Sequence, residues 1–172
     1  MHDLMTINPE KELKRISALK NYNVLDTLPE KSFDEIAKLA SIICDAPVSY
    51  ISFIDSERQW FKSKQGLDAC ETSRDISFCG HAILNNEILV INNALEDERF
   101  FDNPLVLNDP KIRFYAGCPL NIYEDLKLGT LCLIDRVPRE MSDEDIENYL
   151  SQKYYKLDFV HLSDAQRQLV NR

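Results

Sequence analysis

Two segments near the end of the chain constrain the fold most, because both have the composition of β-strands and lie close together. Residues 112–120 and 128–134 are rich in β-branched, aromatic and small apolar side chains, and only the short segment 121–127 separates them. A parallel pair needs a crossover of about a dozen residues or more, so these two strands must pair antiparallel. The sequence therefore predicts an antiparallel pair of strands in this part of the chain.

The first of these strands has two different faces, because side chains alternate across a strand. One face is apolar and carries Ile112, Phe114, Ala116, Cys118 and Leu120. The other carries Arg113, Tyr115 and Gly117, and a guanidinium and a phenol beside a residue without a side chain suit the wall of a polar cavity. We expect Arg113 to pair either with an anionic ligand group or with an internal carboxylate such as Asp97 or Glu98.

Helical patterns lie on both sides of the strands. Asn8 is expected to cap a helix that starts at Pro9, where the missing N–H of proline costs nothing. Ser32-Phe33-Asp34-Glu35 has the pattern of a capping box and predicts a second helix that ends near Asp45. Ser142, followed by acidic residues, is expected to start a C-terminal helix.

The middle of the chain alternates between short elements. We predict a hairpin over 48–63, a short helix over 77–84 and a short strand over 88–91. The connection 92–111 is longer than a compact domain usually contains, and such segments often hold a ligand. Together these elements predict an α+β domain, a mostly antiparallel sheet with helices packed on it.

The length and charge of the chain limit its partners. With 172 residues it forms one domain, which we divide into an N-terminal helix and linker at 1–28, a core at 29–140 and a C-terminal helical segment at 141–172. The net charge of −9 repels phosphate backbones, and no Lys/Arg cluster reverses it locally, so we expect neither nucleic acid nor an anionic membrane as a partner. No apolar run reaches the roughly 18 residues of a membrane span, and no leader pattern opens the chain, which predicts a cytoplasmic protein.

Cys79 and His81 stand two residues apart in the predicted short helix. Residues at this spacing project about 200° apart, so the two side chains do not form a catalytic pair. A zinc site would need further ligands, and the remaining histidines, His2 and His161, lie in the ends of the chain. Two interpretations stay open: a buried thiol beside a hydrogen-bonded histidine, or the wall of a ligand cavity.

The candidates for ligand contact can now be collected. Trp60, in the predicted hairpin, is expected to show one edge of its ring to the cavity. The candidate ligand-binding residues are Arg113, Tyr115, His81, Cys79, Asp97 and Trp60. No residue is assigned a catalytic or metal-binding role, and the sequence identifies no cofactor.

Five stretches of the sequence, in order, are similar to those of one family. They are FDEIAKLASIICDAPVSYISFIDSERQWFKSKQGL, SFCGHAIL, LEDERFFDNPLV, IRFYAGCPL and LGTLCLIDRVPREMS. They closely resemble GAF domains, the small sensory modules of signalling proteins, in a subgroup that usually precedes histidine kinase, diguanylate cyclase or phosphatase output domains. The resemblance extends from about Leu13 to Glu147.

This resemblance implies a six-stranded antiparallel sheet with the terminal helices on one face. The middle helix and the long connection cover the other face, where the ligand cavity of the family lies. It also implies a non-enzymatic sensory or regulatory function, with a small-molecule ligand, a homodimer formed through the terminal helices, and an output kinase or cyclase domain as partners.

Two departures from related GAF proteins bear on cofactors and on catalysis. Tetrapyrrole-binding relatives attach the chromophore through a cysteine directly followed by histidine, whereas Gly80 separates Cys79 from His81 here. The free methionine sulfoxide reductases use cysteines on the long connection, which contains none in this chain. Both departures argue against these roles. The alternative function is a thiol-based redox enzyme or sensor working through Cys79, Cys118 or Cys70.

Overall fold

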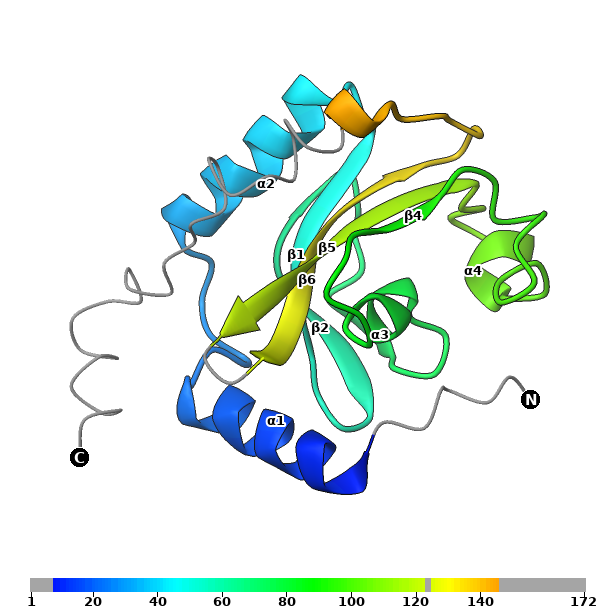
Figure 1. The fold of residues 1–172 in the computed structure, drawn as a ribbon. Helices are drawn as coiled ribbons and strands as arrows, with labels where there is room; N and C mark the ends of the chain where they lie inside the picture. The colour runs from blue at the N-terminus through cyan, green and yellow to red at the C-terminus, as the bar shows by residue number, and fades with distance from the viewer. Residues whose placement is uncertain (1–7, 123–124, 146–172) are drawn as a thin grey trace.

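The computed structural model describes residues 8–122 and 125–145 and contains a six-stranded sheet (Figure 1). The strands are β1 (Val48–Ile54), β2 (Arg58–Gln65), β3 (Glu71–Ser73), β4 (Leu89–Ile91), β5 (Phe114–Ile122) and β6 (Leu126–Asp135). Their order across the sheet is β3-β2-β1-β6-β5-β4, and every neighbouring pair is antiparallel. The α+β class and the six-stranded antiparallel sheet are therefore confirmed.

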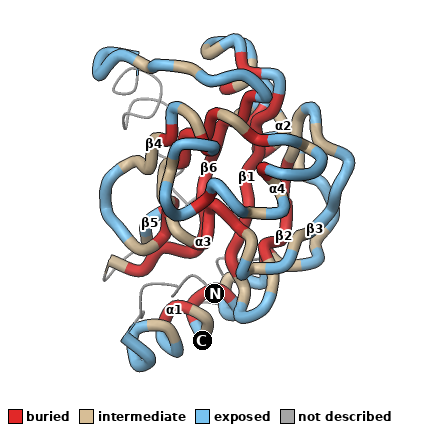
Figure 2. The backbone as a smooth tube through the Cα atoms, turned by 90° about the vertical axis from the view of Figure 1, so that its right-hand side faces the viewer, coloured by how far each residue is buried: buried red, intermediate tan, exposed pale blue. Residues whose placement is uncertain are grey.

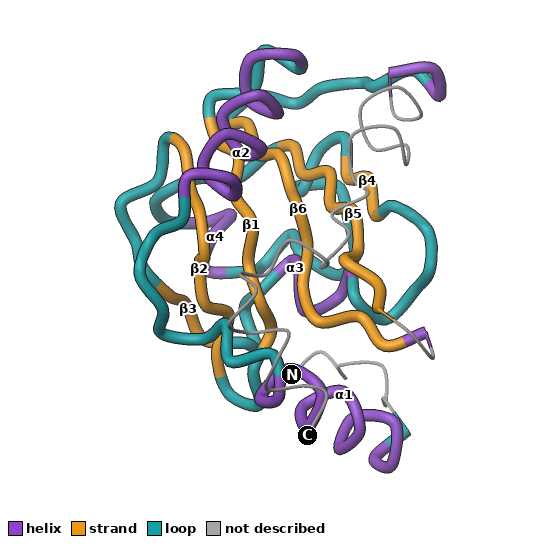
Figure 3. Tube along the Cα trace, turned by 90° about the vertical axis from the view of Figure 1, so that its left-hand side faces the viewer, coloured by secondary structure: helices purple, strands orange, loops and turns teal. Residues whose placement is uncertain are grey.

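In the residues that the structure describes, helices cover both faces of this sheet. They are α1 (Pro9–Asn21), α2 (Lys31–Ile43), α3 (Phe78–Ala82) and α4 (Pro104–Leu107). Figure 1 and the side views in Figures 2 and 3 show α1 and α2 on one side of the sheet and α3 and α4 on the other. The N-terminal helices thus share one face, as expected.

The sheet separates two hydrophobic clusters. Leu19 of α1 and Phe33 of α2 pack with Phe53, Leu131 and other residues on one face. The second cluster, on the face of α3, is formed by Val48, Tyr50, Ile54, Phe61, Phe78, Cys79, Ala82, Ile83, Ile91, Ala94, Phe100, Val106, Ile112, Tyr115, Cys132 and Ile134. Because both faces are covered, the central strands β1 and β6 are buried at every position, as the colouring of Figure 2 shows.

The start of α1 agrees with the sequence prediction, whereas the start of α2 differs from it. The side chain of Asn8 accepts a hydrogen bond from the backbone N–H of Glu10 at 2.9 Å, so the predicted cap of α1 is confirmed. The capping box at Ser32 is wrong, because α2 begins at Lys31 and has no side-chain cap. Glu30, which precedes the helix, instead pairs with the buried Lys62 of β2 at 2.6 Å.

The strand predicted to begin at Ile112 begins at Phe114. The backbone N–H of Ile112 donates to the carbonyl of Leu105 instead of to a neighbouring strand. Its side chain packs with Tyr115 in the cluster of α3, whereas Phe114 faces α1 and α2. The alternation of side chains predicted for residues 112–120 therefore holds only from Phe114 onward.

The structure describes the two ends of the chain only in part. Ser142 Oγ accepts from the backbone N–H of Asp145 at 3.1 Å, as expected at a helix start, but residues 1–7 and 146–172 lie outside the described residues. Most of the predicted C-terminal helical segment, and with it the place of that helix on the sheet, is therefore not described. Of the helices that are described, none has the length and apolar composition needed to cross a lipid bilayer.

The close contact between β1 and β6 predicts the effect of one substitution. A Cβ atom at Gly129 would overlap the backbone carbonyl of Ser52, which cannot move without breaking the strand pairing. We expect Gly129→Ala to lower the free energy of unfolding by about 3 kcal/mol in urea denaturation, the upper part of the range for overpacking. In the control Gly80→Ala the nearest atom outside the local helix would be 3.3 Å away, so its loss should be smaller. Equal stability of Gly129→Ala and wild type would contradict this packing.

Candidate functional site

A cluster of thiols and phenols is buried between α3 and the sheet. It consists of Tyr50 from β1, Cys79 from α3, Tyr115 from β5 and Cys132 from β6, and we call it the thiol–phenol cluster. The Tyr115 hydroxyl donates to Cys79 Sγ at 3.1 Å, and Tyr50 Oη lies 3.6 Å from the same sulfur. Cys132 Sγ is 3.9 Å from Cys79 Sγ. Cys79 is thus the centre of the cluster.

Local hydrogen bonds fix the position of α3 over this cluster. Ser77 caps the helix, because its Oγ accepts from the backbone N–H of Gly80 at 2.9 Å and also bonds the side chain of Gln59 on β2. Phe78 stacks on Phe100 with 4.0 Å between ring centroids. The cap and the ring stack together hold Cys79 against the sheet.

A glycine makes room for the phenol of Tyr115. A Cβ atom at Gly117 would overlap the Tyr115 hydroxyl, so the ring can lie over Gly117 only because that residue has no side chain. Tyr115 is fully buried and contacts Phe78 at 5.2 Å between ring centroids. The pattern Tyr115-x-Gly117 that the sequence placed on one strand face is therefore the packing that directs the phenol to Cys79.

Burial and hydrogen bonding act in opposite directions on the acidity of Cys79. Burial raises the pKa of the Cys79 thiol, but hydrogen bonds with Cys132, Thr130, Tyr115 and Tyr50 lower it to about 6. Burial raises the pKa of Cys132, Tyr50 and Tyr115 well above their usual values. The cluster therefore makes the Cys79 thiol more acidic than an ordinary cysteine, whereas burial makes the surrounding groups less acidic.

Cys79 and His81 contact different partners, as their spacing on the helix predicts. Cys79 is fully buried and points to the sheet, whereas His81 is half-buried. Its Nδ1 lies 3.2 Å from the backbone carbonyl oxygen of Ser77, and its ring meets Phe100 edge-on at 4.7 Å between centroids. His81 therefore belongs to the outer side of α3, beside the long connection.

Arg113 and Asp97 do not pair with each other, so this part of the expectation is wrong. Arg113 donates to the backbone carbonyls of Val106 and Ile112, at 2.9 and 3.0 Å, and so attaches α4 to the start of β5. Asp97 pairs with Arg99 at 2.6 Å, and the Arg99 guanidinium lowers the pKa of that carboxyl group. The carboxylate of Asp97 is thus paired with an arginine of the same long connection and not with Arg113.

Trp60 lies on the opposite face of the sheet from the other candidates. Its ring packs with the cluster under α1 and α2 and is 8% exposed. It borders an open hollow of about 600 Å³, together with Asp34, Lys62 and Cys70. Of the six candidates, the structure therefore brings Cys79 and Tyr115 into contact, places His81, Asp97 and Arg113 around α3 and the long connection, and separates Trp60.

Tyr50 and Cys132 were missed by sequence reasoning. They are directly opposite each other on β1 and β6, so strand register brings them together. The sequence shows each of them within an apolar strand pattern, where a tyrosine or a cysteine is an ordinary core residue. Only knowledge that β1 and β6 are neighbours could have identified the pair.

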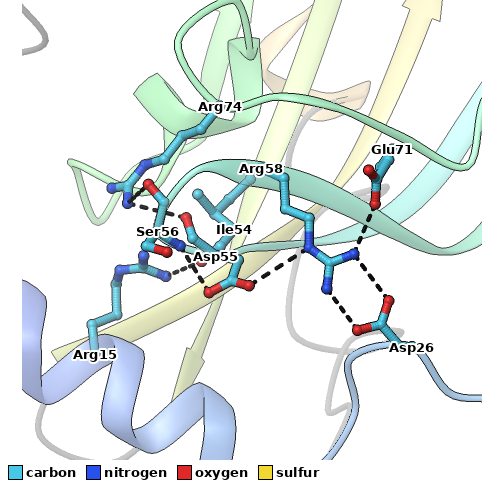
Figure 4. Close-up of polar contacts among 8 residues, drawn as sticks. All are labelled: Arg15, Asp26, Ile54, Asp55, Ser56, Arg58, Glu71 and Arg74. Carbon is cyan, nitrogen blue, oxygen red and sulfur yellow. Dashed lines mark hydrogen bonds and ion pairs between the residues drawn. The ribbon is translucent and has the colours of Figure 1, made fainter.

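A group of arginines connects α1 to the segment that precedes α3. Arg74 donates to Glu12 of α1 at 2.6 Å and to the carbonyl of Asp55 at 3.1 Å. Arg15 of α1 also bonds Glu12, and donates to the carbonyl of Ile54 at 2.6 Å. Figure 4 shows both arginines reaching the turn between β1 and β2. Burial raises the pKa of Glu12, but the two arginines lower it by more.

This arginine group is continuous with the cap of α3. The carbonyl of Arg74 accepts from the backbone N–H of Ser77, the residue that caps the helix over Cys79. A third arginine, Arg58, pairs with Asp26 at 2.6 Å and Glu71 at 2.7 Å on the same side of the hairpin, and its Nε lies 3.6 Å from the carboxylate of Asp55 (Figure 4). In the part of the chain that the structure describes, no three His, Cys, Asp or Glu side chains gather as they would around a metal ion.

The fold and the buried cluster together define the class of this protein. A single α+β domain encloses a polar group between a short helix and a sheet, and an ion pair connects the segment before that helix to the N-terminal helix on the other face. The family model of the GAF domain matches residues 28–148. The chain therefore belongs to the GAF family, whose members are sensory domains of signalling proteins and are generally regulatory.

A curated relative is similar in sequence to most of this chain. A cyclic di-GMP phosphodiesterase of Pseudomonas aeruginosa is 41% identical over 139 residues, which cover 80% of this chain and 24% of that protein. The chain thus spans about a quarter of the length of this relative.

Solved structures share the fold. A GAF domain from a phosphoenolpyruvate-protein phosphotransferase of Coxiella burnetii has a TM-score of 0.60 and 14% identity, with 87% of this chain and 92% of that chain covered. A free methionine-R-sulfoxide reductase of Thermoplasma acidophilum has a TM-score of 0.57 and 13% identity, with 89% and 95% covered. At these identities the likeness shows the fold alone.

The acidity of Cys79 predicts how stability depends on pH. Its pKa in the folded protein, about 6, lies below the value of about 8.5 for an unfolded cysteine. The stabilisation is fully present above the unfolded pKa and is lost as the pH falls through the folded pKa. We expect the free energy of unfolding to rise between pH 6 and pH 8.5 by more in wild type than in Cys79→Ala.

A second cysteine provides the matched control. Burial raises the pKa of Cys118 to about 11, so its contribution is constant below the unfolded pKa. Cys118→Ala should therefore keep the pH dependence of wild type in urea denaturation. Parallel curves for wild type and Cys79→Ala would show that Cys79 keeps its proton throughout this range.

Proposed function

We propose that this domain is a non-enzymatic sensory module that transmits changes at α3 to its terminal helices. The observation that carries the proposal is the contact of Arg74 with Glu12, since it connects the segment that caps α3 to α1 through a charged hydrogen bond. Arg74 and Glu12 are largely buried, with side-chain exposures of 12% and 21%. A displacement of α3 would therefore change the contacts of a helix on the opposite face.

A small molecule or a partner segment at the α3 face is the proposed input. The candidate contacts there are Arg113, Tyr115, His81, Cys79 and Asp97, and Trp60 leaves this set because it lies on the other face. The hydroxyl and thiol groups of the thiol–phenol cluster bond one another in the structure. Each of them could instead form a hydrogen bond with a ligand. Cys79 and Tyr115 are in direct contact in the structure, so a ligand could enter between them only if α3 were displaced. This helix is only five residues long.

The proposed output is a separate signalling domain. The phosphodiesterase relative matches this chain over 24% of its length, so most of that protein lies outside the shared domain. We propose a kinase, cyclase or phosphodiesterase domain as the partner that receives the signal. A cytoplasmic location is proposed with it, supported by five cysteines that are all unpaired in the structure.

A homodimer is part of the proposal, and we place its contact on α2, which lies on the same side of the sheet as the N-terminal helix α1. Three apolar side chains on α2 are exposed to solvent: Leu39 at 46%, Ile42 at 65% and Ile43 at 52%. Apolar side chains that gather on one helix mark a surface that another protein covers. A second copy of α2 is the occupant we propose, because it would present the same apolar side chains.

The connection between α3 and α1 can be tested by amide hydrogen exchange. Tyr115→Phe removes the hydroxyl that donates to Cys79, and we expect it to change exchange in α1 several-fold, as coupling of about 0.5–2 kcal/mol predicts. In an Arg74→Gln background the same substitution should leave α1 unchanged, because the contact with Glu12 is lost. The matched control is Arg58→Gln, which removes ion pairs of the same hairpin that do not reach α1. An equal effect of Tyr115→Phe in the Arg74→Gln background would contradict the proposed route.

The dimer can be tested by sedimentation velocity at micromolar concentration. We expect wild type to sediment with twice the chain mass of 20.0 kDa, and the double variant Leu39→Glu/Ile43→Glu to sediment with the mass of one chain. Leu107→Glu on α4 is the matched control, since Leu107 is 56% exposed on the other face and its replacement should leave the dimer intact. A monomeric wild type would refute this part of the proposal.

A further inference from the structure

Cys79 and Cys132 meet inside the thiol–phenol cluster although 53 positions separate them in the sequence. Their sulfur atoms are 3.9 Å apart, and a disulfide needs about 2 Å, so the two sulfurs would have to approach each other by about 2 Å. Cys132 is fixed in the central strand β6, whereas Cys79 lies on the five-residue helix α3. The required movement therefore falls on α3.

We propose that Cys79 and Cys132 are a peroxide-oxidised pair that forms a reversible disulfide between α3 and the sheet. This inference goes beyond the proposed function, since the oxidation can be observed whether or not the domain transmits a signal. It assigns a modification site and the chemical class of its reactant, a hydroperoxide.

The surroundings of Cys79 favour it as the sulfur that reacts first. The Tyr115 hydroxyl donates to Cys79 Sγ, and such donors stabilise the thiolate, the form that attacks a peroxide. Its lowered pKa agrees with this geometry. By contrast, burial raises the pKa of Cys44 and of Cys118 to about 11, so these two thiols stay protonated at neutral pH.

The reaction balances with the peroxide as the sole oxidant. The Cys79 thiolate attacks one peroxide oxygen, the O–O bond breaks, and the leaving oxygen takes a proton to become an alcohol or water. Cys79 becomes a sulfenic acid. The Cys132 sulfur then attacks the Cys79 sulfur, and the hydroxide that leaves takes the Cys132 proton as water. Two thiols lose two electrons, which reduce the peroxide.

The disulfide would change the contacts that hold α3. Cys79 Sγ would no longer be a thiolate acceptor for Tyr115, whose hydroxyl is fully buried. The cap at Ser77 connects α3 to Arg74, so the strain of the new bond would act on the same segment that contacts α1. Peroxide and reductant would then set two states of the α3 face.

The test uses the complete chain with Cys70→Ser, because Cys70 is exposed and would react independently. Hydrogen peroxide is added at neutral pH, the reaction is quenched, and remaining thiols are alkylated under denaturing conditions before intact-mass and peptide mass spectrometry. We expect two of the four remaining thiols to become protected, a Cys79–Cys132 cross-linked peptide, and full reversal by dithiothreitol.

Two variants keep the outcome decisive. With Cys132→Ala the cross-link must disappear and Cys79 must be trapped as a sulfenic acid by a dimedone probe, whereas Cys118→Ala must behave as the parent. Both variants are accepted only if their thermal unfolding remains cooperative. If Cys79 and Cys132 both stay reduced at a peroxide concentration that oxidises Cys70 in wild type, or if Cys79 pairs with another cysteine, the proposal is overturned.

Discussion

The pairing of β1 with β6 is the contact on which the rest of the structure depends. It joins the early hairpin to the late hairpin and makes both strands central, so each of them is buried on two faces. One face must then be covered by α1 and α2 and the other by α3 and the long connection. The same register sets Tyr50 opposite Cys132 and thereby creates half of the thiol–phenol cluster.

The polar groups of the thiol–phenol cluster are stable inside this core because they bond one another. Cys79 is surrounded by Tyr115, Tyr50 and Cys132, and leaving any of these groups without a partner would cost about 1–3 kcal/mol. The close approach of Tyr115 in turn requires Gly117. A group of mutually dependent contacts of this kind has few intermediate arrangements, which suits a domain that changes between two states.

The sequence predicted the elements well and their partners poorly. Strand alternation placed Tyr115 and Gly117 together, and the cap at Asn8 marked the first helix, because these signals are local. The capping box predicted at Ser32 was wrong because Glu30 pairs with the buried Lys62 of β2, and this long-range contact fixes the start of α2 at Lys31. Trp60 was assigned to the ligand face because alternation separates two faces but does not say which helices will cover each.

The sequence by itself determined the α+β class, the antiparallel pairing of the last two strands and the divergence of Cys79 from His81, since each follows from spacing along one element. Tertiary structure alone decided which side chains surround Cys79 and which acid Arg74 contacts. These contacts join residues far apart in the chain, and strand order, which fixes them, results from the packing of the whole core and not from any local pattern.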